Sequence, residues 1–475
     1  MQMGRSDDNS FFGTDSIGSI LRTIAPPVMV AQLIQALYNI VDSLFIGHYS
    51  PDGLTALSVI FPVQLVLTAL AVGTGVGVNT LMARQYALGK DREANETAGT
   101  GTVLALVSWM LFSIIMIPLM EPYVRTSANV EQAVDYAVSY GTIVCAGSIG
   151  LFVESIWSKV HQAEGNMRLP MYAQLAGAVV NIILDAVMIF GLGPVPEMGV
   201  EGAAIATVIG QCTAAVIVGI SGLRRPPSIS MMSSYIRPIY RLGYPSIVMQ
   251  SLYTVYIVIL NAILGGFCDE AVTVLGLYYK LQTFFFIPLM ALSTCVVPVL
   301  SYNFARKEYG RCRELTDDCL KICIGFMVVG FVCFIFFPEQ LIHLFSGTDK
   351  VVEIGIPAFR WIGLSFFSAA LSLFFPVFFQ AIGGGKASVL LSLTRQIFVM
   401  VPVFWGFSFV GLDYVWIAFP VAETAAGLLG LYLYRRQLSD WARSSGRSLR
   451  TLRCTQSSNP SVDGQPIFFL SIPKQ

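Results

Sequence analysis

Charged side chains are scarce in this sequence. Only 12% of the 475 residues are Asp, Glu, Lys or Arg, about half the share found in an average soluble domain. Hydrophobic residues, by contrast, make up 55% of the chain. This composition excludes an ordinary soluble protein and predicts a membrane protein.

Histidine and cysteine are too few or too scattered to build a metal site. The three histidines, His48, His161 and His343, are isolated near the ends of apolar runs, and no HExxH motif occurs. Among the nine cysteines, Cys319 and Cys323 form the only close pair, and no second pair completes a ligand set. These absences argue against an intramembrane metalloenzyme, which is the least favoured functional alternative.

Long apolar runs occupy most of the chain. Crossing the hydrocarbon core takes roughly 20 apolar residues in a helix. About twelve such runs occur, at residues 20–46, 54–82, 97–122, 135–160, 170–192, 199–222, 238–265, 271–302, 318–343, 352–382, 386–408 and 412–436. The pattern predicts an all-α polytopic membrane protein with 12 transmembrane helices.

The 29 Lys and Arg residues are unevenly divided between the two sides of this predicted bundle. Twenty-three fall in loops on one side, whereas the loops on the other side hold only Arg125 and Lys350. The positive-inside rule assigns the basic side to the cytoplasm, so both termini are expected there. The N-terminal segment lacks a basic region followed by an apolar one, so no cleavable signal peptide is expected. The protein is therefore expected to be a multi-pass protein of the cell membrane.

One loop sequence occurs twice. The stretch HQAEGNMRLP at residues 161–170 returns as FQAIGGGKAS at residues 379–388, 218 residues later. Because six predicted helices separate the copies, the chain is a tandem duplication. An even number of helices in each unit makes the two units parallel repeats, related by an axis along the membrane normal. Two such bundles would enclose a cleft, and rocking them would expose it to each side in turn, which favours a transporter.

The duplication predicts five segments. They are an N-terminal cytoplasmic segment (1–17), an N-lobe with helices 1–6 (18–222), an inter-lobe linker (223–237), a C-lobe with helices 7–12 (238–436) and a cytoplasmic tail rich in Ser and Arg (437–475).

Polar residues in the first half fall on narrow helical stripes. An ionisable residue in a membrane helix is a functional candidate because burying its charge costs several kcal/mol. The predicted first helix carries Gln32, Gln35, Asn39 and Asp42 on one face; the fifth carries Gln174, Asn181 and Asp185; the sixth carries Ala203, Thr207 and Gln211; the fourth carries Glu154. Two carboxylates with amide and hydroxyl oxygens suit Na⁺, and two acids in a low dielectric also suit a proton.

A purely structural interpretation of these polar residues competes with the functional one. Polar side chains often hydrogen-bond a neighbouring membrane helix, and Gln35, Gln174, Gln211 and Glu154 fit either role. Asp42 and Asp185 favour function because a residue that is cheaper to bury would serve a structural role.

The second half has lost the acids at the matching positions. It carries Asn261 opposite Asp42 and Val403 opposite Asp185. Its own ionisable residues, Arg395 and Glu423, are predicted to pair as an internal brace.

At this point the sequence resembles the multidrug and toxic compound extrusion (MATE) transporters. The resemblance covers about residues 18–436. It is carried by RTIAPPVMVAQLIQALYNIVDSLFIG, ARQYALGKDREA, QAEGNMRLP, the NIILD of helix 5 and the GVEGAAIATV entry to helix 6. It implies two six-helix lobes, a central cavity and drug export driven by entry of Na⁺ or H⁺.

The resemblance also implies roles for individual residues. The family's cation site carries over to Asp42, Asn181, Asp185, Thr207 and the backbone carbonyl of Ala203, where Na⁺ could bind. Gln35, Asn39, Glu154, Gln174 and Gln211 are candidates for the substrate cavity, and Pro26 matches the proline at which the family's first helix is thought to bend.

We therefore predict an antiporter for amphiphilic, cationic organic compounds. Its expected partners are small organic substrates and the lipid bilayer, with no nucleic acid, no cofactor beyond the coupling ion, and a monomeric state. A lipid-linked oligosaccharide flippase of the same wider fold is the main alternative. That alternative would be expected to carry a strongly cationic cavity, whereas the clearest charges here are acidic.

Overall fold

The computed structural model describes residues 10–126, 130–343 and 349–444. Their elements are all helical: α1 (Phe11–Thr14), α2 (Ile17–Tyr49), α3 (Pro51–Ala87), α4 (Asp91–Arg125), α5 (Glu131–Gly147), α6 (Ile149–Ala163), α7 (Arg168–Phe190), α8 (Gly199–Gly222), α9 (Ile229–Gly265), α10 (Asp269–Phe285), α11 (Ile287–Ala305), α12 (Tyr309–Phe336), α13 (Pro338–His343), α14 (Asp349–Gly363), α15 (Phe366–Ala381), α16 (Gly385–Leu393), the π-helix η1 (Thr394–Met400), α17 (Val401–Ser408), α18 (Leu412–Val415) and α19 (Ala418–Ser444).

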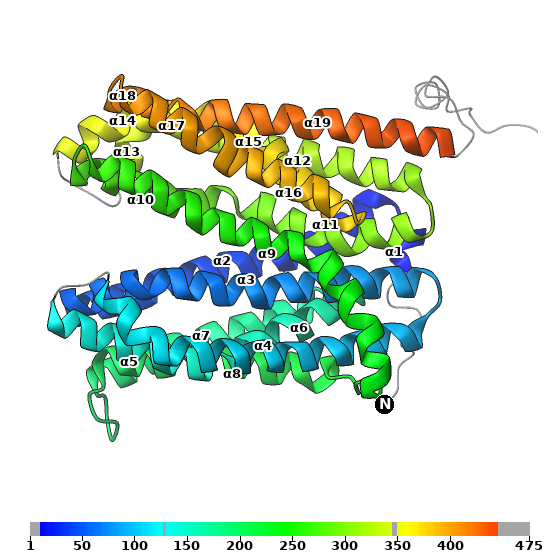
Figure 1. Ribbon diagram of the computed structural model, residues 1–475, viewed down its shortest axis with the longest axis horizontal. Helices are drawn as coiled ribbons and strands as arrows, with labels where there is room; N and C mark the ends of the chain where they lie inside the picture. The colour runs from blue at the N-terminus through cyan, green and yellow to red at the C-terminus, as the bar shows by residue number, and fades with distance from the viewer. Residues whose placement is uncertain (1–9, 127–129, 344–348, 445–475) are drawn as a thin grey trace, which may run out of the picture. The chain divides into compact units, whose positions relative to one another are not determined.

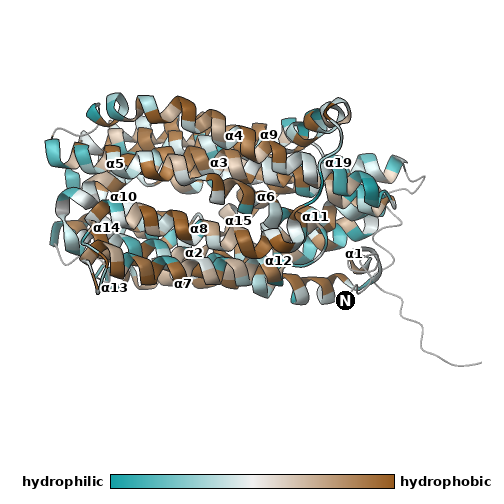
Figure 2. Ribbon diagram, turned by 90° about the horizontal axis from the view of Figure 1, so that it is seen from below, coloured by the Kyte–Doolittle hydropathy of each residue, from teal (hydrophilic) through white to brown (hydrophobic). Residues whose placement is uncertain are grey.

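The helices are long and apolar enough to cross a membrane. Ten spans meet the length and hydropathy requirement, and counting each of two bent helix pairs as one span gives twelve. Figure 2 shows hydrophobic residues along the middle of the helices and hydrophilic residues gathered at their two ends. The predicted all-helical fold with 12 spans is confirmed. We call the end with the loops at residues 88–90, 164–167, 223–228 and 306–308 the basic end.

The two halves of the chain form two layers within the compact unit that ends at Leu431. In Figure 1, helices α3 to α8 of the first half form the lower layer, and α10 and α12 to α18 lie above them. Helix α9 connects the layers, because it packs on α3 and α4 as well as on α10 and α16. A second unit begins at Tyr432 and contains the rest of α19.

The repeated turn has the same backbone geometry in both copies. Gly165 and Gly383 each adopt a φ of 86°, a left-handed conformation that favours glycine. In each turn the glycine N–H donates to the backbone carbonyl oxygen of the glutamine three residues earlier, at 3.2 Å for Gln162 and 3.0 Å for Gln380. The N–H of the following residue donates to the carbonyl oxygen just before that glutamine, from Asn166 to His161 and from Gly384 to Phe379. This pair of hydrogen bonds is the Schellman motif that ends a helix. Both copies therefore end a helix in the same way.

The helices that precede these turns are also bent in the same manner. Helices α5 and α6 meet at 43°, and α14 and α15 meet at 58°. A serine at each break donates to the carbonyl three residues earlier: Ser148 to Cys145 at 2.8 Å and Ser365 to Ile362 at 2.6 Å. The duplication is thus visible in local hydrogen bonding as well as in sequence.

A second pair of turns shows where the copies have diverged. Gly89 follows α3 with a φ of 69°, and Lys307 follows α11 with a φ of 62°. Their hydrogen bonds match, since both donate to the residue three positions earlier. Lys307 is the one non-glycine residue with positive φ in the described part of the chain.

The two halves contact each other closely along α3 and α9. A Cβ atom at Gly77 would lie 2.2 Å from the backbone oxygen of Ile239, and one at Gly243 would lie 2.5 Å from that of Gly73. Only glycine permits this approach of two backbones. Nearer the basic end, Arg84 of α3 donates to the backbone oxygen of Ala381 at 2.8 Å, so side chains also join the halves there.

The predicted segment ends differ from the helix ends in the structure at both termini of the chain. Helix α19 continues to Ser444, past the predicted end of the last span at residue 436, and the remainder of the predicted tail lies outside the described residues. Phe12, in the predicted N-terminal segment, is buried in α1 against Tyr302. Pro26 lies inside α2, which continues through it as one helix. A bend there stays a prediction.

Candidate functional site

A cavity of about 90 Å³ lies within the first half, between α2, α6, α7 and α8. Its wall includes most of the polar residues that the sequence singled out. The lining residues are Ile34, Gln35, Tyr38, Leu151, Glu154, Gln174, Gly177, Ala178, Asn181, Thr207, Gly210, Gln211 and Ala214.

Two glycines let α7 and α8 approach each other beside this cavity. A Cβ atom at Gly177 would lie 2.7 Å from the backbone oxygen of Gly210, and one at Gly210 would lie 2.9 Å from Cβ of Asn181. Small residues at helix contacts are what close packing in membranes requires. The approach brings Asn181 of α7 and Thr207 of α8 into the same cavity wall.

The two predicted acids lie next to this cavity, one helical turn beyond its lining residues. Asp185 follows Asn181 by four residues on α7 and is fully buried, whereas Asp42 follows Tyr38 by four residues on α2 and is partly buried. Helices α2 and α7 pack together, and the two carboxyl groups are near enough for a charge on Asp42 to act on Asp185. The structure thus brings together two acids that are far apart in sequence.

These acids and their neighbours have buried polar atoms without partners. Both carboxyl oxygens of Asp185, Oδ1 of Asp42, both amide atoms of Asn181 and Oε1 of Gln211 lack a hydrogen-bond partner among the described residues. Burying a polar atom without a partner is costly, and burying an unpaired charge is more so. A proton or a cation supplied from outside would remove this cost.

Tyr38 lies among three acids and was missed in the sequence. The charges of Asp42, Glu154 and Asp185 all act on its hydroxyl. The signal was present, because Tyr38 lies three residues after Gln35 and four before Asp42, on the same stripe of α2. An aromatic residue in a membrane helix is common, so its place in the stripe did not distinguish it from a lipid-facing residue.

The other predicted site residues differ in their burial and in whether they line the cavity. Glu154 accepts a hydrogen bond from Ser158 at 2.6 Å and has Gln174 beside it, so its carboxyl has partners, of which Gln174 lines the same cavity. Ala203 is fully buried within α8. Gln35 and Asn39 are both exposed residues of α2, but only Gln35 lines the cavity.

The donor set fits a hard monovalent cation or a proton. Among the described residues, no three His, Cys, Asp or Glu side chains gather as a metal site. A cation here would therefore combine the two carboxylates with amide and hydroxyl oxygens of Asn181 and Thr207, the ligand type that hard cations prefer. The cavity is smaller than the roughly 300–1,000 Å³ of pockets for drug-sized ligands, so by itself it suits an ion with a few waters.

In the second half the buried acid is paired. Glu423 of α19 and Arg395 of η1 form an ion pair with an Nη2–Oε1 distance of 2.7 Å, and Nε of Arg395 donates to both carboxyl oxygens at 2.9 Å. Ser372 also donates to Glu423. The predicted internal brace is confirmed.

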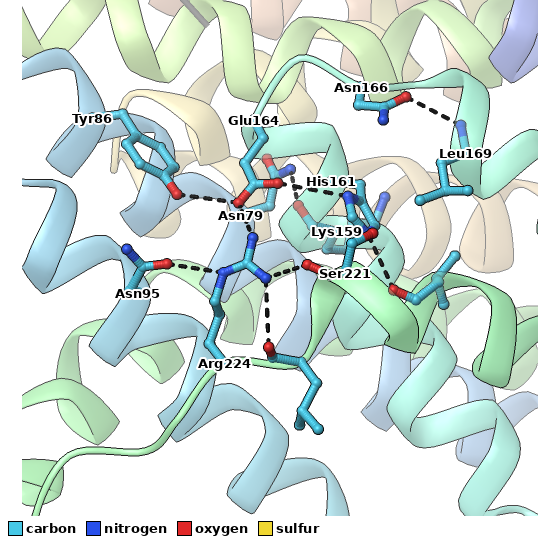
Figure 3. A network of polar contacts seen from close by, with 12 residues as sticks. Asn79, Tyr86, Asn95, Lys159, His161, Glu164, Asn166, Leu169, Ser221 and Arg224 are labelled. Atoms are coloured by element: carbon cyan, nitrogen blue, oxygen red, sulfur yellow. Dashed lines mark hydrogen bonds and ion pairs between the residues drawn. The ribbon is translucent and has the colours of Figure 1, made fainter. Parts of the chain in front are cut away.

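A separate polar network fastens the basic end of the first half (Figure 3). Glu164, in the first copy of the repeated turn, accepts from Arg224 at 2.6 Å and from Tyr86 at 3.3 Å. Arg224 also donates to Asn95 at 2.9 Å. Burial opposes ionisation of Glu164, but hydrogen bonding to His161 and the charge of Arg224 outweigh it and hold the pKa of this carboxyl below its ordinary value.

One family model matches both halves of the chain. A model of the MatE family matches residues 27–187 and again residues 245–405. The matches are offset by 218 residues, the interval between the two copies of the repeated turn. Together they cover more than half of the chain.

Relatives and solved structures extend over nearly the whole length. An FAD transporter of Shewanella oneidensis is 24% identical over 437 residues, which are 88% of this chain and 95% of that protein. The multidrug export protein MepA of Staphylococcus saprophyticus is 25% identical over 441 residues, which are 90% and 96% of the two chains.

A solved structure described as the outward-facing conformation of a multidrug resistance MATE family transporter matches with a TM-score of 0.85 at 22% identity. It covers 91% of this chain and 98% of that one. Because the MatE family model matches both halves, the chain belongs to the MATE family of membrane transporters, which are not enzymes.

Proposed function

We propose that this transporter is a secondary active antiporter that exports amphiphilic organic cations in exchange for H⁺ or Na⁺. The observation that carries the proposal is the pair of acids Asp42 and Asp185. Their buried oxygens lack partners among the described residues, beside a small cavity whose wall includes several polar side chains. An antiporter needs a site that alternates between ion and substrate. A fully satisfied polar cluster would gain little from either.

The coupling ion is assigned to Asp42, Asn181, Asp185 and Thr207. Ion entry neutralises the acids and removes the attraction that holds a cationic substrate nearby. Gln35, Glu154, Gln174 and Gln211 would contact the polar end of the substrate, since they line the same cavity. The bulk of a drug-sized molecule requires more space than this cavity offers, so it would bind between the halves.

Export requires the halves to open on alternate sides. We propose that the basic end faces the cytoplasm, because most of the Lys and Arg residues lie there. The close contact of Gly77 and Gly243, together with the Arg84–Ala381 hydrogen bond, would then keep the cytoplasmic side closed. This arrangement corresponds to the state that releases substrate to the outside, with the protein acting as a monomer.

The test uses purified protein in liposomes with an imposed H⁺ or Na⁺ gradient and ethidium as the reporter substrate. Asp42→Asn and Asp185→Asn should each abolish gradient-driven ethidium transport. Asn261→Ala changes the residue that matches Asp42 in the second half, and it should transport nearly as well as the parent. Normal coupled transport by either aspartate variant would remove the proposed ion site.

Other substrates distinguish the remaining alternatives. One relative is named an FAD transporter, so FAD should be tested beside ethidium, and a lipid-linked oligosaccharide should be tested as the flippase substrate. Movement of FAD alone would replace organic cations by anionic aromatic compounds while leaving ion coupling intact. Movement of only the lipid-linked sugar would favour the flippase.

A further inference from the structure

A second and larger cavity opens at the basic end, outside the site described above. Its volume is about 390 Å³, within the range of ligand pockets. It lies between the end of α3, the following turn, the start of α4 and the first turns of α9. The lining residues are Leu81, Arg84, Gln85, Leu88, Lys90, Glu93, Ser234, Tyr235 and Pro238.

The charge of this pocket is unbalanced. Lys90 is paired with Glu93 at 2.9 Å. Arg84 has no carboxylate partner among the ion pairs of the described residues, and neither has Arg241, whose charge acts on it. Among the lining residues, Arg84 and Lys90 are set against one acid, Glu93, so the wall carries a net positive charge. Glu96 lies beside the wall, where it accepts a hydrogen bond from Tyr235 at 2.6 Å and is itself paired with Arg92.

One donor in the pocket is buried and unused. Nε of Arg84 is inaccessible to solvent and has no acceptor in the part of the chain that the structure describes. The same guanidinium donates through Nη2 to Ala381 and lies over the ring of Phe304 at 5.5 Å. Its position is therefore fixed by contacts to the second half, while one N–H remains unsatisfied. The guanidinium is thus a fixed cation in the pocket wall with incomplete hydrogen bonding, and such a cation favours an anionic ligand beside it.

We propose that this pocket binds a phosphate-bearing anion. Arginine is well suited to phosphate because its planar fork can donate two parallel hydrogen bonds. Leu81, Leu88 and Pro238 add an apolar wall beside the cations, which fits the junction between a lipid headgroup and its acyl chains. Basic pockets between membrane helices bind anionic headgroups in this way. A free phosphate offers the same oxygens without the apolar part.

Binding would also act on the contact between the halves. An anion held beside the Arg84 guanidinium would keep this group in place, so that Nη2 stays directed at the backbone oxygen of Ala381 in the second copy of the repeated turn. A Cβ atom at Gly383 would lie only 3.1 Å from Nη2, which shows how closely the turn fits around the arginine. A ligand that stabilises this arrangement stabilises the state in which the basic end is closed.

The test measures the melting temperature of the full chain in neutral detergent with added phosphatidylglycerol, phosphatidylcholine or inorganic phosphate. Phosphatidylglycerol should raise the melting temperature in a concentration-dependent manner, and phosphatidylcholine should not. Arg84→Gln should abolish the rise. Because Arg84→Gln also removes the Ala381 contact, Lys90→Gln and Arg241→Gln serve as second variants, and each should weaken the response by several-fold.

Arg92→Gln is the matched control, because Arg92 lies on the same surface, pairs with Glu96 and does not line the pocket. It should keep the full response. An equal rise with inorganic phosphate that Arg84→Gln removes would identify a free anion as the ligand, whereas a rise with phosphatidylglycerol alone would identify a lipid.

The proposal is overturned if neither anion shifts the melting temperature, if Arg84→Gln responds like the parent, or if Arg92→Gln loses the response equally. A hydrogen-exchange measurement tests the link to the second half. Phosphatidylglycerol should slow exchange in residues 379–388, and unchanged exchange there would overturn the link. Neither readout requires transport, so the result is independent of the proposed antiport.

Discussion

Removing one member of the Arg395–Glu423 pair should destabilise the second half strongly. The side chains are only 6% and 2% exposed, and three contacts of 2.7 to 2.9 Å join them. Glu423→Gln would leave a buried guanidinium without a counter-charge. Breaking a buried pair in this way typically costs about 3–5 kcal/mol, and an arginine at the centre of a membrane helix costs about 2.5–3.5 kcal/mol on insertion scales. We expect a loss of about 3 kcal/mol.

The destabilisation by Glu423→Gln should not depend on pH. Arginine cannot give up its proton, so the loss of unfolding free energy in this variant should be constant between about pH 5 and 9.

The assay is reversible unfolding in mixed micelles of mild detergent and SDS, which yields a free energy of unfolding for each variant. A loss of 3 kcal/mol corresponds to a fall of roughly 100-fold in the ratio of folded to unfolded protein. The double variant Arg395→Met/Glu423→Leu should recover most of the stability, since an apolar pair leaves no charge unpaired. A loss below 1 kcal/mol for Glu423→Gln would refute the reasoning.

Further predictions concern the turns, the helix contact and the coupling. Glu164→Gln should lower the free energy of unfolding by about 1.5–3 kcal/mol at neutral pH, because it weakens the hydrogen bond to Arg224. Since the pKa of Glu164 lies below its ordinary value, this stabilisation should be present at neutral pH and lost as the pH falls through the lowered pKa. Equal losses of unfolding free energy at pH 7 and pH 3 would contradict this. Gly89→Lys, which copies Lys307, should cost about 1–2 kcal/mol from the left-handed backbone alone, since its Cβ meets open space, and an unchanged unfolding free energy would count against this. Gly210→Val should lower the free energy of unfolding by about 1–3 kcal/mol and impair coupled transport, because its side chain would meet α7. The control Gly406→Ala should do neither, because a Cβ atom at Gly406 meets open space. Substrate affinity should fall by roughly 5- to 150-fold as the coupling ion is raised, with an equal reciprocal effect; binding assays on Asp185→Asn should show this effect lost, and its persistence would separate coupling from Asp185.

The fold was largely predictable because the membrane imposes a length and a polarity on each element. Twelve apolar runs became twelve spans, and the repeated turn at Gly165 and Gly383 ends both helices with the same φ. The pairing of Arg395 with Glu423 was also predictable, since two opposite charges in adjacent spans have few other partners. These features depend on local sequence or on strong energies.

The details of the site were less predictable. Stripe positions placed Gln35, Asn181 and Thr207 in one cavity wall, yet Asn39 on the same stripe does not line that cavity. A helical stripe is wider than a cavity, so periodicity alone cannot tell which of its members reach the space between helices. Arg84 had no signal at all, because its acceptor is a backbone oxygen 297 residues away, and a backbone oxygen leaves no trace in sequence.

The two halves share a fold but differ in how they treat a buried acid, and this difference explains why coupling is proposed for one half alone. Glu423 is held by Arg395 and Ser372, so an incoming cation would have to displace an arginine already in contact with the carboxylate. Asp42 and Asp185 have oxygens without a partner in the described part of the chain, so the proposed proton or Na⁺ would displace no protein group there. Duplication gave both halves the same helices and turns. Under the proposed function, the permanent counter-charge in the second half removes the need for an external ion there, and its absence among the described residues of the first half leaves the two acids to the coupling ion.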